Sequence, residues 1–405
     1  MRISSNQIHQ VAVNAMLDQQ SKLSDTQQQV ATGQRISSAA DDPVAAARIV
    51  DLQQLVDNFD QFQGSINSSR NRLEVQEGVL ENVVVAIQRV RELALQSNNA
   101  IQTNDTREFI AEEIKQLNQE LMGLANSVDS NNDFLFSGSK VKFQPFTTTI
   151  NGNFQYNGDD NRRMLQIGPN RQIASGDSGT DVFRTIRSGN GSFSINSSET
   201  NHGEAVANPG FVDKNYKPDF FVLEFKKDSK TQDMYYKIND LNGNMLIPAD
   251  HNTKYREDGE IEFMGIHTSF KGEPMAGDRF VFMPSKNQDL FSTLRGLSNT
   301  LSTPRNSPDS KANMSNDINQ SLVSLDQALD NILKIRSNTG SRLRALDNQH
   351  EINSSHLLHI KEIQSEIKDL DYTEAVTRLN LRLTGLEASQ KAYSKVQNLS
   401  MFDYI

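Results

Sequence analysis

The N-terminal half of the chain carries apolar residues at steps of three and four, the spacing that lines one face of an α-helix. This stripe follows Asp42 and Pro43; aspartate can accept hydrogen bonds from the free amides of a first helical turn, where proline loses no bond. The polar residues Ser69 and Gln76 occupy two of its slots. The pattern predicts one helix from Pro43 to about Ser97, roughly 80 Å long. The apolar members of the stripe are Leu52, Leu55, Phe59, Phe62, Ile66, Leu73, Leu80, Val83, Ile87, Val90 and Ala94.

Two further stripes repeat this spacing. After a polar break, Asp105 and Glu108 are expected to cap a second helix, whose apolar positions run from Ile110 to Val128. A third stripe opens at Pro308 and continues over 318–367. Because none of these helices can bury its apolar face alone, we expect arms that are distant in sequence to pack together as a bundle.

Residues 141–290 carry a different pattern. Short runs of β-branched and aromatic residues, such as Phe220–Phe225 and Met234–Ile238, are bounded by turn residues such as Asn242-Gly243. This segment also holds 13 of the 20 phenylalanines, which is enough for a small core of its own. We therefore expect an inserted β-rich outer domain.

The two ends of the chain differ from both regions. Residues 1–41 are rich in Gln, Ser and Asn with few apolar residues, whereas the last segment has a firmer apolar stripe. Because neither end finds a partner within its own segment, we predict that they pair as a coiled coil and then pack against neighbouring molecules. The residues expected to carry this assembly are Ile3, Val13, Met16, Leu23, Val30, Val376, Leu379, Leu383, Leu386, Tyr393, Val396, Leu399 and Phe402.

The predicted fold is a multidomain α+β protein with three parts. The terminal coiled coil comprises 1–43 and 361–405, the long-helix bundle 44–140 and 291–360, and the inserted β-rich domain 141–290. A hydrophobic content of 36% and a mean hydropathy of -0.59 are typical of long helices with polar outer faces. The sequence therefore favours an elongated molecule.

Composition excludes several classes of function. A net charge of -10 argues against nucleic-acid binding, and the lack of cysteine excludes disulfides and thiolate chemistry. The first residues lack the apolar run of a cleaved signal peptide, and no segment approaches the length of a membrane span. Before motifs are considered, these features favour a cytoplasmic protein.

Catalytic signatures are missing from the sequence. No phosphate-binding glycine loop or nucleophile elbow occurs, and His350, His356 and His359 are better explained as solvated helix residues than as metal ligands. Asp369-Leu370-Asp371 is interpreted as a helix cap, and Gly158–Asn161 as a turn. We predict no enzyme, cofactor or metal. An enzyme hosted in the β-rich insert is an alternative that requires a convergent polar pocket there.

Three motifs resemble the bacterial flagellin superfamily. Residues Arg35–Pro43 (RISSAADDP) resemble the turn after the first flagellin helix, and Gln88–Ser97 (QRVRELALQS) resemble its central helical motif. Residues Ser365–Tyr372 (SEIKDLDY) resemble the turn into its last helix. The resemblance implies a structural protein of the flagellum.

Other motifs resemble the hook-filament junction proteins within that superfamily more than the filament flagellins. These are Asn132–Ser139 at the exit from the helical arm, Tyr156–Asp159 with Asn161–Arg163 and Asp181–Phe183 in the insert, and the C-terminal Leu399–Ile405. Filament flagellins more often end in a Leu-rich run that finishes with Arg. The resemblance thus implies a junction subunit.

Such a junction subunit forms a ring of identical chains between the hook-side junction protein and flagellin. The resemblance also implies an export chaperone on the C-terminal helix and extracellular delivery by type III export without signal cleavage. That route replaces the cytoplasmic expectation. The alternative is flagellin itself, in which Arg89, Leu93 and Glu113 would match a surface read by an innate immune receptor; an ordinary solvated helix face explains these residues equally well.

Overall fold

A computed structural model of the chain describes residues 5–149, 152–248 and 253–398. The chain divides into two compact units, each built from separated stretches of sequence. One unit combines Met1–Gly64 with Asn348–Ile405, and the other comprises Ser65–Asp347. We call them the terminal unit and the central unit. The helices α2 (Pro43–Ser97) and α5 (Pro308–Lys368) contribute to both units.

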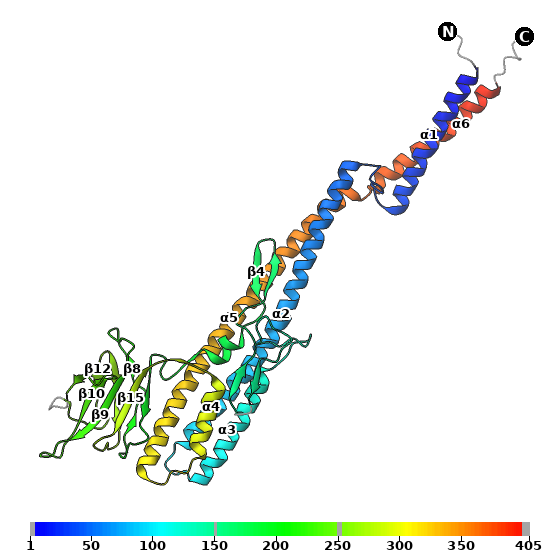
Figure 1. Cartoon of the computed structure of the whole chain (residues 1–405). Helices are drawn as coiled ribbons and strands as arrows, with labels where there is room; N and C mark the ends of the chain where they lie inside the picture. Colours follow the sequence, from blue (N-terminus) through cyan, green and yellow to red (C-terminus); the bar gives the residue numbers. More distant parts are fainter. Residues whose placement is uncertain (1–4, 150–151, 249–252, 399–405) are drawn as a thin grey trace, which may run out of the picture. The chain divides into compact units, whose positions relative to one another are not determined.

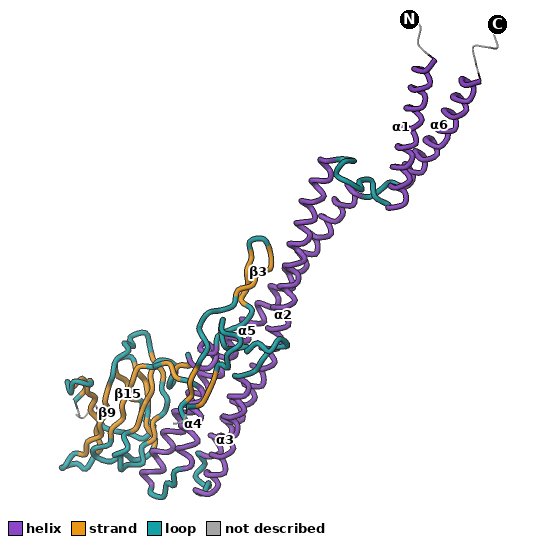
Figure 2. The backbone as a smooth tube through the Cα atoms, turned by 45° about the vertical axis from the view of Figure 1, so that its right-hand side comes forward, coloured by secondary structure: helices purple, strands orange, loops and turns teal. Residues whose placement is uncertain are grey.

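Helices joined by turns make up the terminal unit in its described residues. Here α1 (Ser5–Thr32) lies beside α6 (Tyr372–Asn398), and the start of α2 lies beside the end of α5 (Figures 1 and 2). The Gln63 side-chain amide on α2 donates hydrogen bonds to the His350 carbonyl at 3.1 Å and to Ser354 Oγ at 2.9 Å on α5. Sequence-distant arms therefore pair, as their stripes predict.

In the central unit, α2 and α5 pack with α3 (Asn104–Ala125) and α4 (Leu290–Ser302) around a large apolar core. The polar slots predicted in the α2 stripe are also buried. The Gln76 amide donates to a carboxylate oxygen of Asp177 at 2.8 Å and to Thr339 Oγ1 at 3.3 Å. A buried polar residue is tolerated here because its hydrogen bonds are made.

The predicted bounds of α2 and the predicted start of α5 at Pro308 are confirmed, but the predicted cap of α3 is wrong. Its N-cap is Thr103, whose hydroxyl accepts from the Thr106 amide while the Thr106 hydroxyl accepts from the Thr103 amide. This reciprocal pair leaves Asp105 only as an acidic residue of the first turn, where the helix dipole favours it. The helix ends at Ala125, so Val128 falls in the loop that follows.

All the strands described lie between Phe146 and Gln288. They are β1 (Phe146–Thr148), β2 (Phe154–Tyr156), β3 (Met164–Gly168), β4 (Arg171–Ala174), β5 (Ile186–Arg187), β6 (Phe193–Ser197), β7 (Val206–Ala207), β8 (Phe211–Val212), β9 (Phe221–Lys227), β10 (Met234–Asp240), β11 (Met245–Ile247), β12 (Ile261–Phe263), β13 (Ile266–Thr268), β14 (Phe270–Lys271), β15 (Arg279–Pro284) and β16 (Asn287–Gln288).

Strands β1, β2 and β5 pack against the large helical core, whereas Ile167 of β3 and Ile173 of β4 form a small separate cluster with side chains of α2 and α5. β1 pairs with β2, β3 with β4, and β5 with β16. Phe146 and Phe183 are buried against Phe291 of α4, with ring centroids 5.1 and 5.6 Å away. Part of the aromatic content of the β-rich segment therefore stabilises the helices.

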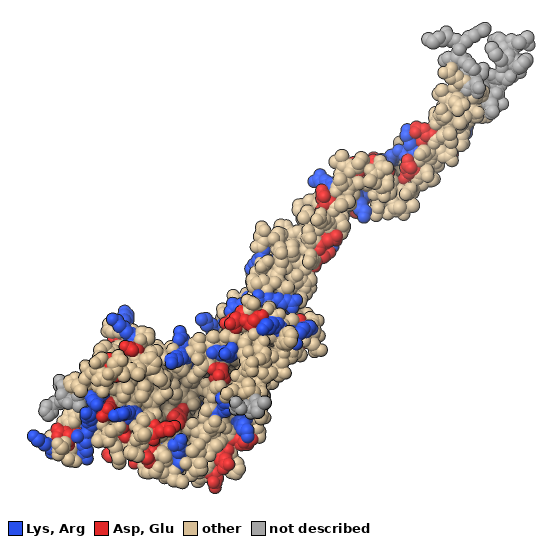
Figure 3. Space-filling model, in the orientation of Figure 1, with Lys and Arg blue, Asp and Glu red and all other residues tan. Residues whose placement is uncertain are grey.

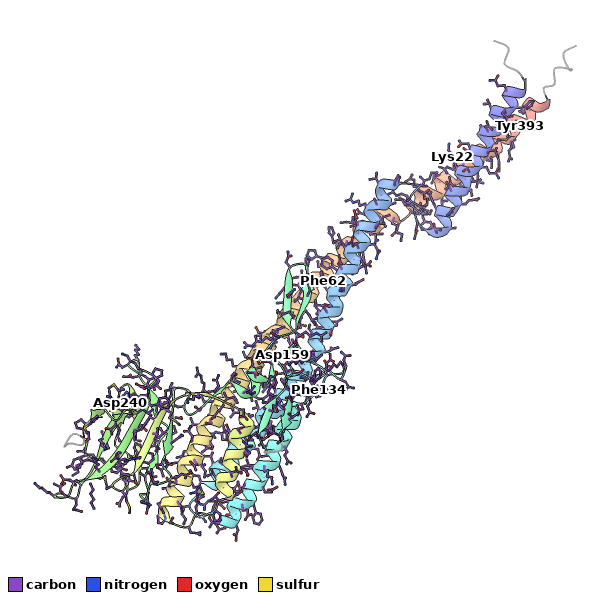
Figure 4. All side chains as sticks on the ribbon, in the orientation of Figure 1. Lys22, Phe62, Phe134, Asp159, Asp240 and Tyr393 are labelled. Carbon is purple, nitrogen blue, oxygen red and sulfur yellow. The ribbon has the colours of Figure 1, made fainter. Side chains whose placement is uncertain are left out.

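The separate core is formed by the strands from β6 to β15. A five-stranded antiparallel sheet has the order β11-β10-β9-β15-β6, and a three-stranded sheet has the order β12-β13-β8. Phe225 lies at the centre, with the rings of Tyr255, Phe270 and Phe280 5.3 to 6.1 Å from its own. Asp240, labelled in Figure 4, ends one of the sheet strands.

One buried side chain links this β domain to α5. The Asn316 amide oxygen accepts from the Ala207 N–H at 2.8 Å, and its amide nitrogen donates to the Ala205 carbonyl at 3.0 Å. The side chain thus pairs with β7 as a neighbouring strand would.

The predicted fold class, a long-helix bundle and terminal coiled coil with a β-rich insert, is confirmed; the three domain boundaries stay predictions. Across the described part of the chain, no helix has the length and apolarity that crossing a bilayer requires.

Candidate assembly surfaces

The α1–α6 pair is held by hydrogen bonds as well as by apolar contacts. The Arg382 guanidinium of α6 donates to the Lys22 carbonyl and to Thr26 Oγ1 of α1, and Gln19 Nε2 donates to the Arg382 carbonyl at 3.3 Å. Gly385 allows this approach, because a Cβ there would lie 2.9 Å from Gln19 Nε2. Nearer the chain ends, His9 meets the ring of Tyr393 edge-on at 5.8 Å (Tyr393 and Lys22 are labelled in Figure 4).

Much of the predicted assembly stripe faces this pairing. Among the described side chains, Leu23 is buried, whereas Val376 and Leu383 are 44% and 39% exposed. Val396 lies within α6, and Ile3, Leu399 and Phe402 fall outside the described residues. The half-buried members are Val13, Met16, Val30, Leu379, Leu386 and Tyr393.

Other apolar residues project from the pair and were not predicted. Val11, Leu17 and Leu381 are 65%, 59% and 68% exposed. Single exposed leucines are ordinary, but here several lie on two helices whose outer faces have no further helix of the subunit against them in the described residues. In Figure 3 the visible surface of this pair is largely uncharged towards the chain ends, as expected because α1 carries no Asp, Glu, Lys or Arg before Asp18. These residues lie outside the single apolar stripe that the spacing predicts for each helix.

Two of the flagellin-like motifs meet where the terminal pair ends. The Arg35 amide donates to the Lys368 carbonyl at 2.8 Å, and the Leu370 amide donates to the Gly33 carbonyl at 3.0 Å. Gly33 has a φ of +71°, and a Cβ there would lie 2.9 Å from the hydroxyl of Tyr372. The turn after α1 and the turn before α6 therefore hold each other by a short antiparallel bridge.

Aspartates complete both turns. The Asp41 carboxylate accepts from the Ser38 and Ser37 amides at 2.8 and 3.0 Å, and these bonds lower the pKa of Asp41, that from Ser38 most. Asp371 accepts from the amides of Thr373 and Glu374 at 2.9 and 3.2 Å, which confirms the predicted helix cap.

The motifs that resemble junction proteins also come together, within the central unit. Asp159, labelled in Figure 4, accepts from the Ser139 amide at 2.7 Å, and the Tyr156 hydroxyl donates to the Phe136 carbonyl at 3.0 Å. Burial raises the pKa of Tyr156 to about 12. The predicted turn at Gly158–Asn161 is confirmed, and it braces the exit from the helical arm.

The residues matched to a receptor-facing surface are only partly exposed. Arg89 forms ion pairs with Glu113 at 2.8 Å and Glu92 at 3.3 Å, and the hydrogen bond with Glu113 is the largest cause of the raised pKa of Arg89. Leu93 is 1% exposed and belongs to the helical core. Within the subunit, only the two charged residues of the three therefore offer side chains to a partner, and receptor binding stays a prediction.

The tail histidines make ordinary helix contacts. The ring of His356 lies 5.7 Å from that of Phe59, and His359 Nδ1 lies 3.7 Å from Glu362 Oε2. Among the described residues, the three side chains whose metal-ligating atoms lie close together are not these histidines. They are Asp213, Glu262 and His267 in the β domain. The candidate functional site is a set of surfaces and turns on the helices.

Comparisons with known proteins agree with this arrangement. The bacterial flagellin N-terminal helical region matches residues 3–141, and the bacterial flagellin C-terminal helical region matches residues 322–405. Both chain ends contribute to the helices, and both match flagellin regions. This combination defines a flagellin-like structural protein.

Two relatives define it further. The solved flagellar hook associated protein-3 of Legionella pneumophila is 31% identical, with a TM-score of 0.76 over 79% of this chain and 98% of that one. Flagellar hook-associated protein 3 of Salmonella typhimurium is 22% identical over 402 residues, 99% of each chain. The chain belongs to the flagellar hook-associated protein 3 family, the hook-filament junction proteins of the bacterial flagellum.

The flagellin alternative is weaker. The flagellin of Clostridium tyrobutyricum is 29% identical, but over only 141 residues, 35% of this chain and 37% of its own. The likeness to flagellins thus covers a shared helical part, whereas the likeness to the junction proteins covers nearly the whole chain. The protein is a structural component of the flagellum, and it assembles with other flagellar components.

Proposed function

We propose that this junction subunit assembles through α1 and α6, whose outer faces seat against the same helices of neighbouring subunits in a ring. The observation that carries the proposal is the set of exposed apolar residues on this pair, Val11, Leu17 and Leu381 above all. Two helices can shield only the sides that face each other, so the remaining apolar area stays in water until another chain covers it.

The energies support such a step. Fully burying one leucine side chain contributes about 2 kcal/mol, and association through several of them on each of two neighbours is enough to offset part of the entropy lost on assembly. The predicted stripe then acts mainly inside the subunit, by pairing α1 with α6. Val376 and Leu383, which are exposed, add to the outer surface.

The same surface supports the proposed partners. On one side the ring meets the hook-side junction protein, and on the other it meets flagellin, whose helical ends are of the same type. An export chaperone covers α6 before assembly, because an apolar helix face left open in the cell is prone to aggregate. The chain leaves the cell by type III export without a cleaved signal peptide and acts outside it.

Complementation of a strain that lacks the gene tests this proposal. The empty deletion strain should release unpolymerised flagellin into the medium, and the wild-type gene should restore filaments. A double variant, Leu17→Gln with Leu381→Gln, should be exported and folded, because the hydrogen bonds between α1 and α6 stay intact. Its strain should still release flagellin, because the polar side chains weaken the contacts between subunits.

The matched control is Leu241→Gln in the β domain, since Leu241 is 63% exposed. This variant should restore filaments as well as wild type does. Full filaments on the double variant would refute assembly through these faces. Equal release of flagellin by the control would show that exposed leucines matter everywhere, and the terminal surface would lose its special role.

A further inference from the structure

The sheet β12-β13-β8 has one apolar face and one face of metal-ligating residues. Ile261, Phe263 and Ile266 are buried in the β-domain core. Because side chains alternate along a strand, Glu262 and His267 point the other way, and the register places them directly opposite each other. The strand register thus brings a carboxylate and an imidazole together outside the core.

A third ligand comes from the neighbouring strand. Phe211 pairs with His267 across β8 and β13, and Asp213 lies two residues further on, on the same face. The amide of Asp213 donates to the Gly265 carbonyl at 2.9 Å, which fixes the end of β8 to the hairpin turn. One donor atom from each of Asp213, Glu262 and His267 then lies within 4.8 Å of the others.

The imidazole is held in one orientation. Its Nδ1 lies 2.8 Å from Glu260 Oε1, and its ring stacks on Phe211 with centroids 4.7 Å apart and planes 2° from parallel. When Glu260 accepts the Nδ1 proton, Nε2 keeps its lone pair, and Nε2 is the nitrogen that lies 3.8 Å from Asp213 Oδ2. A carboxylate behind the ring in this way is typical of metal-bound histidines.

We propose that Asp213, Glu262 and His267 bind one divalent first-row transition-metal ion, with Glu260 orienting the imidazole. One nitrogen and two carboxylate oxygens suit Zn²⁺ and its neighbours, whereas Ca²⁺ and Mg²⁺ favour oxygen alone. Ligand bonds of about 2.1 Å in a tetrahedron place donor atoms about 3.4 Å apart. His267 Nε2 and Asp213 Oδ2, at 3.8 Å, need to approach only slightly. Water takes the fourth position.

The charge around the imidazole is negative, which favours a bound cation. The groups that face the imidazole are the carboxylates of Glu260, Glu262 and Asp213, and together they raise the pKa of His267, Glu260 most of all.

Zinc titration of the full-length monomer tests the proposal. Protein stripped with a chelator is titrated with ZnCl₂ in a calorimeter, and the wild type should bind one ion per chain. His267→Gln and Glu262→Gln should each lower the affinity at least about tenfold, and Glu260→Gln about 10- to 100-fold. His359→Gln is the matched control, because His359 also faces a glutamate, at 3.7 Å, but belongs to no group of three ligating side chains in the described residues; it should change nothing.

Three results would overturn the site. These are a wild-type chain that binds no stoichiometric Zn²⁺, a His267→Gln variant that binds as wild type does, and equal losses in His267→Gln and His359→Gln. Circular dichroism checks that each variant folds. If His267→Gln disturbs the sheet, the exposed Glu262→Gln variant decides the question, and its unchanged affinity would equally refute the proposal.

Discussion

The β domain and the α1–α6 pair show two ways in which one chain treats apolar residues. In the β domain, Phe225, Phe280 and Phe282 are at most 1% exposed, and each lies within a cluster of other rings. Among the described side chains of α1 and α6, the buried ones are only Leu23, Thr26 and Ala375. The first region completes its core within the chain, whereas the second leaves apolar side chains exposed, and this is the surface through which we propose that the subunit assembles.

The difference follows from the geometry of the elements. Strands from β6 to β15 satisfy their backbone through neighbours and bury the side chains of one face together. An isolated pair of helices satisfies its backbone alone but covers only one narrow face of each helix. Stability that comes from packing is therefore concentrated in the β domain and in the helical core, and the proposed assembly contacts lie on the terminal helices.

The largest predicted effect lies in the β domain. Phe225→Ala should destabilise it by about 3–5 kcal/mol, because the ring is fully buried and truncation leaves a cavity. Urea unfolding followed by tyrosine fluorescence reports this domain, since four of the eight tyrosines lie between Tyr216 and Tyr255. The control is Phe211→Ala, in the same domain but 61% exposed, which should cost about 1 kcal/mol or less. Equal costs would contradict a self-contained core.

A smaller effect should come from the turn of the terminal unit. Gly33→Ala should destabilise that unit by about 1–2 kcal/mol, because the positive φ of Gly33 disfavours any other residue and the new Cβ would press on the Tyr372 hydroxyl. Faster hydrogen exchange across α1 and α6 would measure the loss. Gly64→Ala in α2 of the same unit meets no atom within 4 Å, and it should stabilise the helix by about 0.5–1 kcal/mol. The two substitutions should therefore have opposite signs.

The smallest effects are expected from changes in pH. Acid should destabilise the terminal unit, and alkali should destabilise the β domain. The pKa of Asp41 is lowered from 3.8, so its contribution is present above that value and is lost as the pH falls through the folded pKa. Acid should then loosen the turn of the terminal unit. Helicity of Asp41→Asn should vary less than that of wild type below pH 4, and an unchanged acid transition would exclude this cause.

Alkali should act on the β domain instead. Burial raises the pKa of Tyr255 from 10.0 to about 12, so the neutral phenol stabilises the fold fully below pH 10 and this contribution is lost as the pH rises towards 12. Tyr255→Phe should make urea stability of the β domain less dependent on pH in that window. A slope equal to that of wild type would show that other groups control alkaline unfolding.

Several features could be predicted because the chain marks them locally. Pro43 and Pro308 begin α2 and α5 as expected, and Asp371 caps α6. The helix α4 was missed, although Asp289 caps it and Leu290, Leu294 and Leu301 form its buried stripe. Its 13 residues lie directly after the last strand, where a short apolar run does not distinguish a helix from a strand.

The sites depended on pairings that no local pattern contains. Leu17 and Leu381 are exposed because the facing positions of α1 and α6 are taken by other residues. His267 meets Asp213 and Glu262 only through the register of three short strands, and a slip of one residue would separate them. Such contacts cannot be derived from spacing along the chain.

Local signals in the chain predict the helical arms, the β-rich insert and, through the motifs, the flagellin-like character, because caps, periodicity and turn residues act within a few positions of one another. Only the packing of whole segments decides which core each phenylalanine joins, which apolar residues of α1 and α6 stay exposed, and which of the side chains Asp213, Glu262 and His267 meet on one face. The physical reason is that burial and register are settled between segments tens or hundreds of residues apart, where packing of the whole unit selects one arrangement.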